Sequence, residues 1–260
     1  MEIIYGPVSS WRLGRSLGID LICQKGKVCS LDCIYCSLGK TTELTTKRRV
    51  FISKDRMIQE LKNAMKLVEA DVITFSGTGE PTLALNLGEA ITAVRDISDL
   101  PIAVLTNSSL MNREDVRRDL AQADVVIGEL DAPNEEMFKL INRPHHEVHL
   151  KDTIDGMKKF REEFDGKLAV EVMFVPENKE LSKDIASIVR TFSPDEVQIN
   201  TPLRPSSVRP LTPEELASVK KDFFGMSIRS VYEARKREVR KVVGQDKIKR
   251  LKRQAWSQHR

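Results

Sequence analysis

The sequence predicts an α/β protein that folds as an incomplete (β/α)6 barrel followed by a basic, helical C-terminal extension. Six short apolar runs alternate along the chain with segments whose apolar residues recur every three or four positions, up to residue 200. Apolar runs of this kind are typical of a parallel sheet covered by helices. A closed barrel needs eight such units, so six units favour an open barrel, with a doubly wound open sheet as the alternative.

The expected strands are rich in Val, Ile and Leu, and they cover residues 16–22, 71–76, 102–107, 124–130, 168–175 and 196–200. Helical spacing follows the first strand, for example at Met57, Leu61 and Met65. After residue 200 the alternation stops, and the segment beginning at Thr212-Pro213 is typical of a helix start. We therefore divide the chain into a barrel of residues 1–212 and a helical, basic extension of residues 213–260.

The composition is that of a globular protein, with 40% hydrophobic and 31% charged residues among 260. No apolar run is long enough to cross a bilayer, and the first residues lack the pattern of a secretory signal. We expect a cytoplasmic protein with no membrane partner. In that compartment thiols usually stay reduced, so the cysteines are expected to bind metal or to react rather than to form disulfides.

Three of the four cysteines lie close together after the first expected strand, with the spacing C-x3-C-x2-C at Cys29, Cys33 and Cys36. A structural zinc ion or an electron-transfer [4Fe–4S] cluster normally has four protein ligands. Three thiolates would leave one iron of a cluster open, which is what catalysis at a metal requires. A zinc site completed by Cys23 or by a distant histidine is the alternative, although paired C-x2-C motifs are absent from the sequence.

The cysteine motif, with the aromatic Tyr35 before its last cysteine, resembles that of the radical S-adenosylmethionine (radical SAM) superfamily. The resemblance implies a [4Fe–4S] cluster whose open iron binds the amino and carboxylate groups of SAM. It also implies that an electron from the cluster cleaves SAM to a 5′-deoxyadenosyl radical. An electron donor such as a ferredoxin or flavodoxin is the partner that this chemistry needs. Cys23 has no role in the motif.

The segment SGTGEP, residues 76–81, resembles the G-G-E element with which the superfamily binds the SAM amino group. Thr78 replaces its first glycine, whereas Gly79 and Glu80 match. An ordinary strand-to-helix turn is the alternative interpretation.

Polar side chains follow each later strand, and the carboxyl ends of parallel strands meet at one edge of a sheet. We expect them to surround SAM, although each alone is also compatible with a cap, a turn or a solvated position. They are Thr106, Asn107 and Ser108 at the end of the third strand, Glu129 and Asp131 at the end of the fourth, Asn178 in the loop after the fifth, and Asn200 at the end of the sixth. Glu129 and Asp131, two positions apart on a strand, are expected to share one face and to contact ribose hydroxyls.

Residues 5–205 as a whole resemble the branch of the superfamily that includes archaeal tRNA wyosine synthases. Those enzymes have three further cysteines for a second cluster, and this chain has only Cys23 to spare. The resemblance therefore implies the branch, and an RNA base as the leading substrate, without wyosine chemistry. Thr201, Arg204, His145 and His146 are expected to contact the substrate at the mouth of the barrel.

Residues 229–260 contain twelve Lys and Arg against three acidic residues, within a chain of net charge +4. An amphipathic helix in solvent is one interpretation of this tail. The other is an RNA contact in which the cations neutralise phosphates and Trp256 stacks on a base.

The function that we expect is that of a radical SAM oxidoreductase or transferase, which abstracts hydrogen from a substrate that the sequence does not identify. An RNA base is the first candidate. A peptide or protein is the second, including activation of a glycyl-radical enzyme. The competing class is a zinc-stabilised protein that binds nucleic acid without catalysis.

Overall fold

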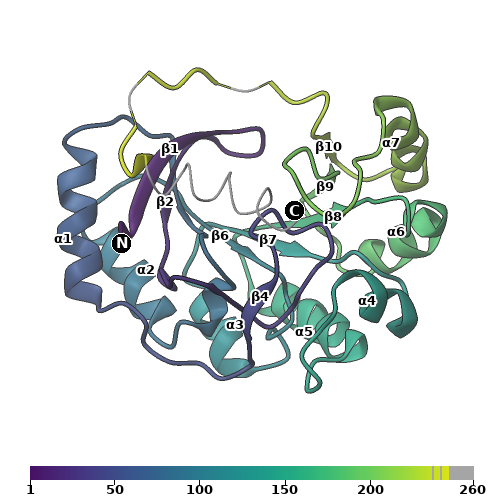
Figure 1. Ribbon diagram of the computed structural model, residues 1–260, viewed down its shortest axis with the longest axis horizontal. Helices are drawn as coiled ribbons and strands as arrows, with labels where there is room; N and C mark the ends of the chain where they lie inside the picture. The colour runs from purple at the N-terminus through teal and green to yellow at the C-terminus, as the bar shows by residue number, and fades with distance from the viewer. Residues whose placement is uncertain (236, 241, 246–260) are drawn as a thin grey trace.

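A curled eight-stranded sheet forms the centre of the computed structural model, which describes residues 1–235, 237–240 and 242–245 (Figure 1). The strand order is β1-β2-β5-β6-β7-β8-β9-β10. The strands are β1 Ile4–Ser10, β2 Gly14–Ile19, β5 Val72–Phe75, β6 Ile102–Thr106, β7 Val125–Glu129, β8 Lys167–Met173, β9 Glu196–Asn200 and β10 Ile228–Ser230. All neighbours are parallel except the hairpin of β1 and β2. The predicted incomplete barrel is confirmed.

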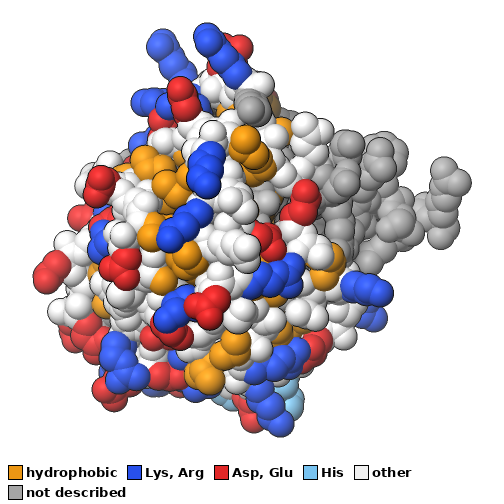
Figure 2. Space-filling view, turned by 90° about the vertical axis from the view of Figure 1, so that its left-hand side faces the viewer, with side chains coloured by type: hydrophobic (Ala, Val, Ile, Leu, Met, Phe, Trp, Pro, Cys, Tyr) orange, Lys and Arg blue, Asp and Glu red, His pale blue; other side chains and the backbone are white. Residues whose placement is uncertain are grey.

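Helices alternate with the parallel strands and cover the outer side of the sheet (Figure 1). They are α1 Lys54–Met65, α2 Leu87–Arg95, α3 Glu114–Leu120, α4 Glu135–Ile141, α5 Leu150–Glu163, α6 Ser182–Arg190 and α7 Pro213–Lys220. Each buries an apolar stripe, as α1 does with Met57 and Leu61. The face that carries α1 shows charged side chains of both signs among scattered hydrophobic ones (Figure 2). No helix in the described part of the chain is both long and apolar enough to cross a membrane.

The six predicted strands correspond to β2 and to β5 through β9, within a few residues at each end. The sequence did not predict β1 and β10, the two edges of the sheet. β10 pairs with β9 in parallel, and Arg229 on β10 forms an ion pair with Glu196 on β9 (3.1 Å). This cross-strand pair lets a charged three-residue segment complete the sheet.

The helix start at Thr212 is confirmed, because its hydroxyl accepts a hydrogen bond from the Glu215 amide in a capping box. The helix expected from residue 229 onward is wrong for the described part of the tail. There the chain forms β10 and then turns and extended segments, and Val243 exchanges two backbone hydrogen bonds with Gly6 on β1 (3.0 and 2.6 Å). The chain thus passes from one edge of the sheet to the other (Figure 1). Trp256 lies outside the described residues.

Candidate functional site

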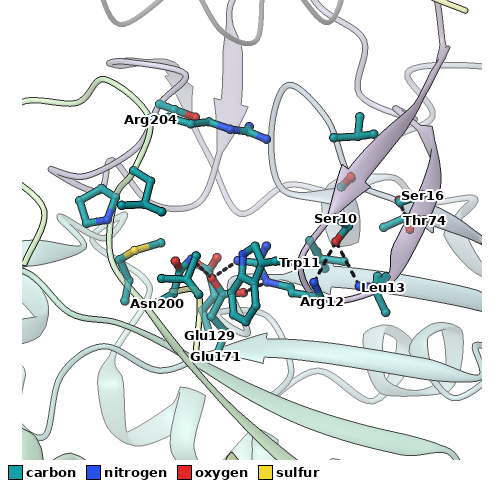
Figure 3. Close-up of a pocket in the computed structure, with 18 of the residues that line it drawn as sticks. Ser10, Trp11, Arg12, Leu13, Ser16, Thr74, Glu129, Glu171, Asn200 and Arg204 are labelled. Atoms are coloured by element: carbon teal, nitrogen blue, oxygen red, sulfur yellow. Dashed lines mark hydrogen bonds and ion pairs between the residues drawn. The ribbon is translucent and has the colours of Figure 1, made fainter. Parts of the chain in front are cut away.

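A cavity of about 480 Å³ lies among the β1–β2 hairpin, the cysteine loop and the carboxyl ends of the parallel strands (Figure 3). The hairpin contributes Trp11 and Arg12, and the cysteine loop contributes Tyr35 and Cys36. The strand ends add polar groups, which include Ser76, Glu129, Glu171, Asn200, Thr201 and Arg204. One cysteine of the motif therefore faces the same space as the polar groups of four strands, β5, β7, β8 and β9.

The cysteine loop is held by a second, two-stranded sheet of β3 Lys27–Cys29 and β4 Thr41–Leu44. Cys29 ends β3, and Cys33 and Cys36 follow in a tight turn in which the Cys36 amide donates to the Cys33 carbonyl (3.1 Å). All four cysteines are free thiols. Cys23 lies apart from this loop, and its thiol donates to the Glu2 carbonyl (3.3 Å).

The sulfur atoms of the loop have amide donors like those around iron–sulfur clusters. The Asn107 side-chain amide lies 3.4 Å from the Cys29 sulfur, and that of Asn142 lies 3.5 Å from the Cys33 sulfur. Burial raises the pKa of the Cys29 thiol to about 11, so a metal is needed to make it a thiolate at neutral pH. The donor set fits a cluster with three cysteine ligands.

In the described part of the chain, no three His, Cys, Asp or Glu side chains are arranged to hold one metal ion. A [4Fe–4S] cluster does not require three side chains around one ion, because its cysteines bind different iron atoms.

The segment after β5 is built into the wall beside the cysteine loop. Gly79 bridges Val28 of β3, and a Cβ on Gly79 would lie 1.9 Å from the Val28 carbonyl oxygen, so only glycine fits. The Thr78 hydroxyl and amide both donate to Asp20 (2.7 and 3.0 Å). Thr78 is thus turned into the protein, and Ser76 and Gly77 line the cavity here.

Glu80 is also turned inward, and its buried carboxylate accepts hydrogen bonds from three neighbours. These are the Thr106 hydroxyl (2.7 Å), the Asn107 amide (2.8 Å), and the amide and hydroxyl of Thr82 (3.1 and 2.8 Å). Burial raises the pKa of Glu80, and these hydrogen bonds oppose the rise. Since Asn107 also contacts Cys29, the carboxylate connects the end of β5 to the cysteine loop through β6. Ser108, the second residue after β6, is fully buried.

The two acids after the fourth predicted strand do not share a role. Asp131 is buried, and its carboxylate accepts hydrogen bonds from the Tyr35 hydroxyl, the Asn142 amide (2.7 Å) and the Met173 amide (2.8 Å). It therefore fastens the cysteine loop to β8. Glu129 lines the cavity instead, and burial together with the nearby Asp131 and Glu171 raises its pKa well above the ordinary value. A protonated Glu129 can both donate to and accept from a hydroxyl group.

An ion pair that the sequence did not predict crosses the cavity. Arg12 at the tip of the β1–β2 hairpin forms two hydrogen bonds with Glu171 on β8, one of them 2.6 Å long, and the Arg12 guanidinium lies 4.4 Å from the centre of the Trp11 ring. Asn200 donates to the same carboxylate (2.6 Å). Figure 3 shows these groups converging on one another. The sequence did contain a signal for this ion pair. Glu171 is a charged residue within the apolar run 168–175, and a buried charge requires a partner of opposite charge.

The other predicted residues take different places. Arg204 is exposed and reaches over the opening of the cavity (Figure 3). Thr201 lines the cavity, but its hydroxyl is engaged with the Phe174 carbonyl (2.9 Å). Asn178 is buried and donates to the Asp131 carbonyl (2.8 Å). The rings of His145 and His146 lie 4.1 Å apart and are tilted by 36°, and the His145 amide donates to the carbonyl of Ser30, next to Cys29.

Comparison with known sequences gives one family and several relatives. The sequence profile of the Radical SAM superfamily matches residues 24–188. A UPF0026 protein from Methanocaldococcus jannaschii is 36% identical over an alignment of 257 positions, which covers 96% of this chain and 75% of that protein. A protein named GTPase Obg from Brachyspira hyodysenteriae is 38% identical over an alignment of 268 positions, which covers 98% of this chain but only 39% of that protein.

Solved structures share the fold. SuiB from Streptococcus suis, bound to S-adenosylmethionine, superposes with a TM-score of 0.61 at 13% identity, over 79% of this chain and 48% of that chain. A structure titled native anSMEcpe with bound AdoMet gives a TM-score of 0.60 at 16% identity, over 84% of this chain and 64% of that chain. The chain thus spans about half the length of SuiB.

Replacing Glu80 by Gln is expected to destabilise the metal-free protein by about 1–3 kcal/mol, because the new amide would face hydrogen-bond donors in a buried place. Denaturant unfolding measures this loss. Glu89→Gln is the matched control, since Glu89 is exposed on α2, where it pairs with Lys54 (2.7 Å), and a change within about 0.5 kcal/mol is expected there. Equal stability of the two variants would contradict the role given to Glu80.

Asp131 predicts a specific pH dependence. Burial raises its pKa to about 6, above the value in an unfolded chain. The raised pKa adds stability at low pH that is lost as the pH rises through about 6. Between pH 5 and pH 7.5 the wild-type protein is expected to lose on the order of 1 kcal/mol relative to Asp131→Asn. Unfolding of both metal-free proteins at the two pH values checks this, and an unchanged difference would show that the carboxyl does not titrate there.

Proposed function

The chain belongs to the radical SAM superfamily, and we propose that its three loop cysteines hold a [4Fe–4S] cluster next to a SAM molecule bound in the adjoining cavity. When bound, the cluster supplies the electron that cleaves SAM and so starts hydrogen abstraction from a substrate. The observation that carries this proposal is the position of Cys36, which lies on the loop with Cys29 and Cys33 and also lines the cavity.

Different residues of the chain would hold the cluster and SAM. Cys29, Cys33 and Cys36 would be the iron ligands, with Asn107 and Asn142 donating hydrogen bonds to two of the sulfurs. The backbone at Ser76 and Gly77 forms the cavity wall next to the G-G-E-like segment. Glu80 acts on SAM indirectly, through the turn that it holds.

The remaining cavity groups suit a nucleoside. A protonated Glu129 can exchange hydrogen bonds with ribose hydroxyls. The hydrogen-bonded group of Arg12, Glu171 and Asn200 crosses the cavity and would exclude water from the reacting centre. As in other radical SAM enzymes, an external electron donor is required.

An RNA base is the substrate that we favour. Arg204 is an exposed cation at the opening of the cavity, and Arg235, Arg237 and Arg240 are exposed along the segment that leads from β10 back to β1. An exposed cation at a cavity, followed by a basic segment, suits a substrate that carries phosphates on either side of its reacting group. A peptide is the alternative substrate, and the tRNA titrations described below distinguish the two.

Replacing any one of Cys29, Cys33 or Cys36 by alanine is expected to abolish cluster loading and formation of 5′-deoxyadenosine, because a cubane held by three thiolates cannot lose one. Iron and sulfide analysis after anaerobic purification should give about four irons per wild-type chain. Cys23→Ala is the control and should retain both properties, because Cys23 lies off the loop. Zinc in place of iron, or cluster loss in the Cys23 variant alone, would overturn the assignment.

The RNA proposal predicts that deletion of residues 236–260, which removes ten Lys and Arg, weakens tRNA binding by more than about tenfold. The cut follows Arg235 so that β10 and the buried Val231 remain. Binding by the intact protein should also weaken steeply as salt rises, since counterions are released on association. Titrations with bulk tRNA at two salt concentrations measure both effects.

A melting curve of the truncated protein accompanies these titrations, because the deletion also removes the Gly6–Val243 hydrogen bonds. Salt-insensitive binding that is equal in both forms would turn the search towards peptide substrates.

A further inference from the structure

Lys27 is a buried cation at the start of the cysteine loop. It begins β3, two residues before Cys29, so the two side chains point to the same side of the strand. Its exposed fraction is 5%, which is rare for lysine. The backbone is fixed independently of the side chain, because Lys27 pairs with Thr41 in the two-stranded sheet and its carbonyl accepts from the Thr42 hydroxyl (2.8 Å).

The Lys27 ammonium group lies near the three loop cysteines. Lys27 is hydrogen-bonded to Cys36 and lies within electrostatic reach of Cys29 and Cys33. The buried Lys27 side chain therefore ends beside the cysteines that would hold the cluster.

This arrangement has an energetic consequence. A buried ammonium group is unfavourable unless a negative charge accompanies it. Neutral thiols do not provide that charge. They become thiolates when iron binds, and the loop then gains the negative charge that Lys27 requires.

We propose that Lys27 is a positioning residue that raises the reduction potential of the cluster. The inference rests on the proposed function, because it needs the cluster to be bound at Cys29, Cys33 and Cys36. On reduction, a low-potential donor loses one electron and the cluster gains it, while Lys27 keeps its proton. A fixed positive charge beside the cluster stabilises the more negative, reduced state more than the oxidised state.

Position in the fold separates this role from substrate binding. Cys36 and Tyr35 are among the residues that line the described cavity, and Lys27 is not. Its ammonium group meets the cluster ligands, so its effect would pass through the cluster.

The test compares Lys27→Met, which removes the charge at similar size, with Lys27→Arg, which keeps the charge. Lys40→Met is the matched control, because Lys40 is an exposed lysine that follows the same loop and water screens its charge. Each protein is reconstituted anaerobically and its iron content is determined. The cluster is then titrated with a redox-buffered reductant and followed by electron paramagnetic resonance.

At the potential where half of the wild-type cluster is reduced, the ratio of reduced to oxidised cluster is expected to fall about tenfold in Lys27→Met. For one electron this corresponds to a midpoint about 59 mV more negative. Lys27→Arg and Lys40→Met should keep the wild-type ratio. A Lys27→Met protein that holds the cluster with the wild-type midpoint would overturn the inference.

Loss of the cluster in Lys27→Met is also decisive. If the metal-free variant melts at or above the wild-type temperature and Lys27→Arg holds the cluster at the wild-type midpoint, the cluster responds to the positive charge at this position, and the inference stands. If the metal-free variant melts at a lower temperature, or if Lys27→Arg also fails to hold iron, the lysine serves packing and the inference fails. Wild-type protein that binds no iron would instead refute the proposed function.

Discussion

Buried carboxylates hold the cysteine loop against the end of the sheet, and the site depends on them. Asp20 accepts hydrogen bonds from Thr78 and from the backbone after β2, Glu80 accepts from β6 and its following loop, and Asp131 accepts from the cysteine loop and β8. Each carboxylate would be strongly unfavourable in the interior if these donors were missing. The groups that surround the cavity are therefore in place before any cofactor binds, which reduces the ordering that binding must impose.

Much of the barrel could be predicted from the sequence, because strands that are covered on both sides must be apolar along their whole length. The two edge strands were not predicted, because their sequences are not apolar along their whole length. β1 contains Gly6, Pro7 and two serines at its end, and β10 is three residues long with an arginine in the middle. Their pairing depends on partners distant in the chain, such as Glu196 for Arg229, and no local pattern records such a partner.

The candidate site, like the fold, could be predicted from the sequence only in part. Its cysteines and strand-end positions follow from spacing and from the rule that parallel strands present their carboxyl ends together. The orientation of each side chain does not. Glu129 is the last residue of β7 and faces the cavity, whereas Asp131 lies beyond the strand, where the alternation of faces no longer applies. Arg12 and Glu171 are separated by 159 positions, so their contact depends on the curvature of the whole sheet.

The return of the chain from β10 to β1 bears on how the molecule avoids unwanted association. An open sheet has two free edges, and a free edge offers unpaired backbone groups to a strand of another molecule. On β1 the backbone of Gly6 is already paired with Val243, and the next residue, Pro7, has no amide hydrogen to donate. A short stretch of the C-terminal segment thus occupies the edge at which a second copy would otherwise add its strand, so the barrel can remain open for its substrate without becoming a template for aggregation.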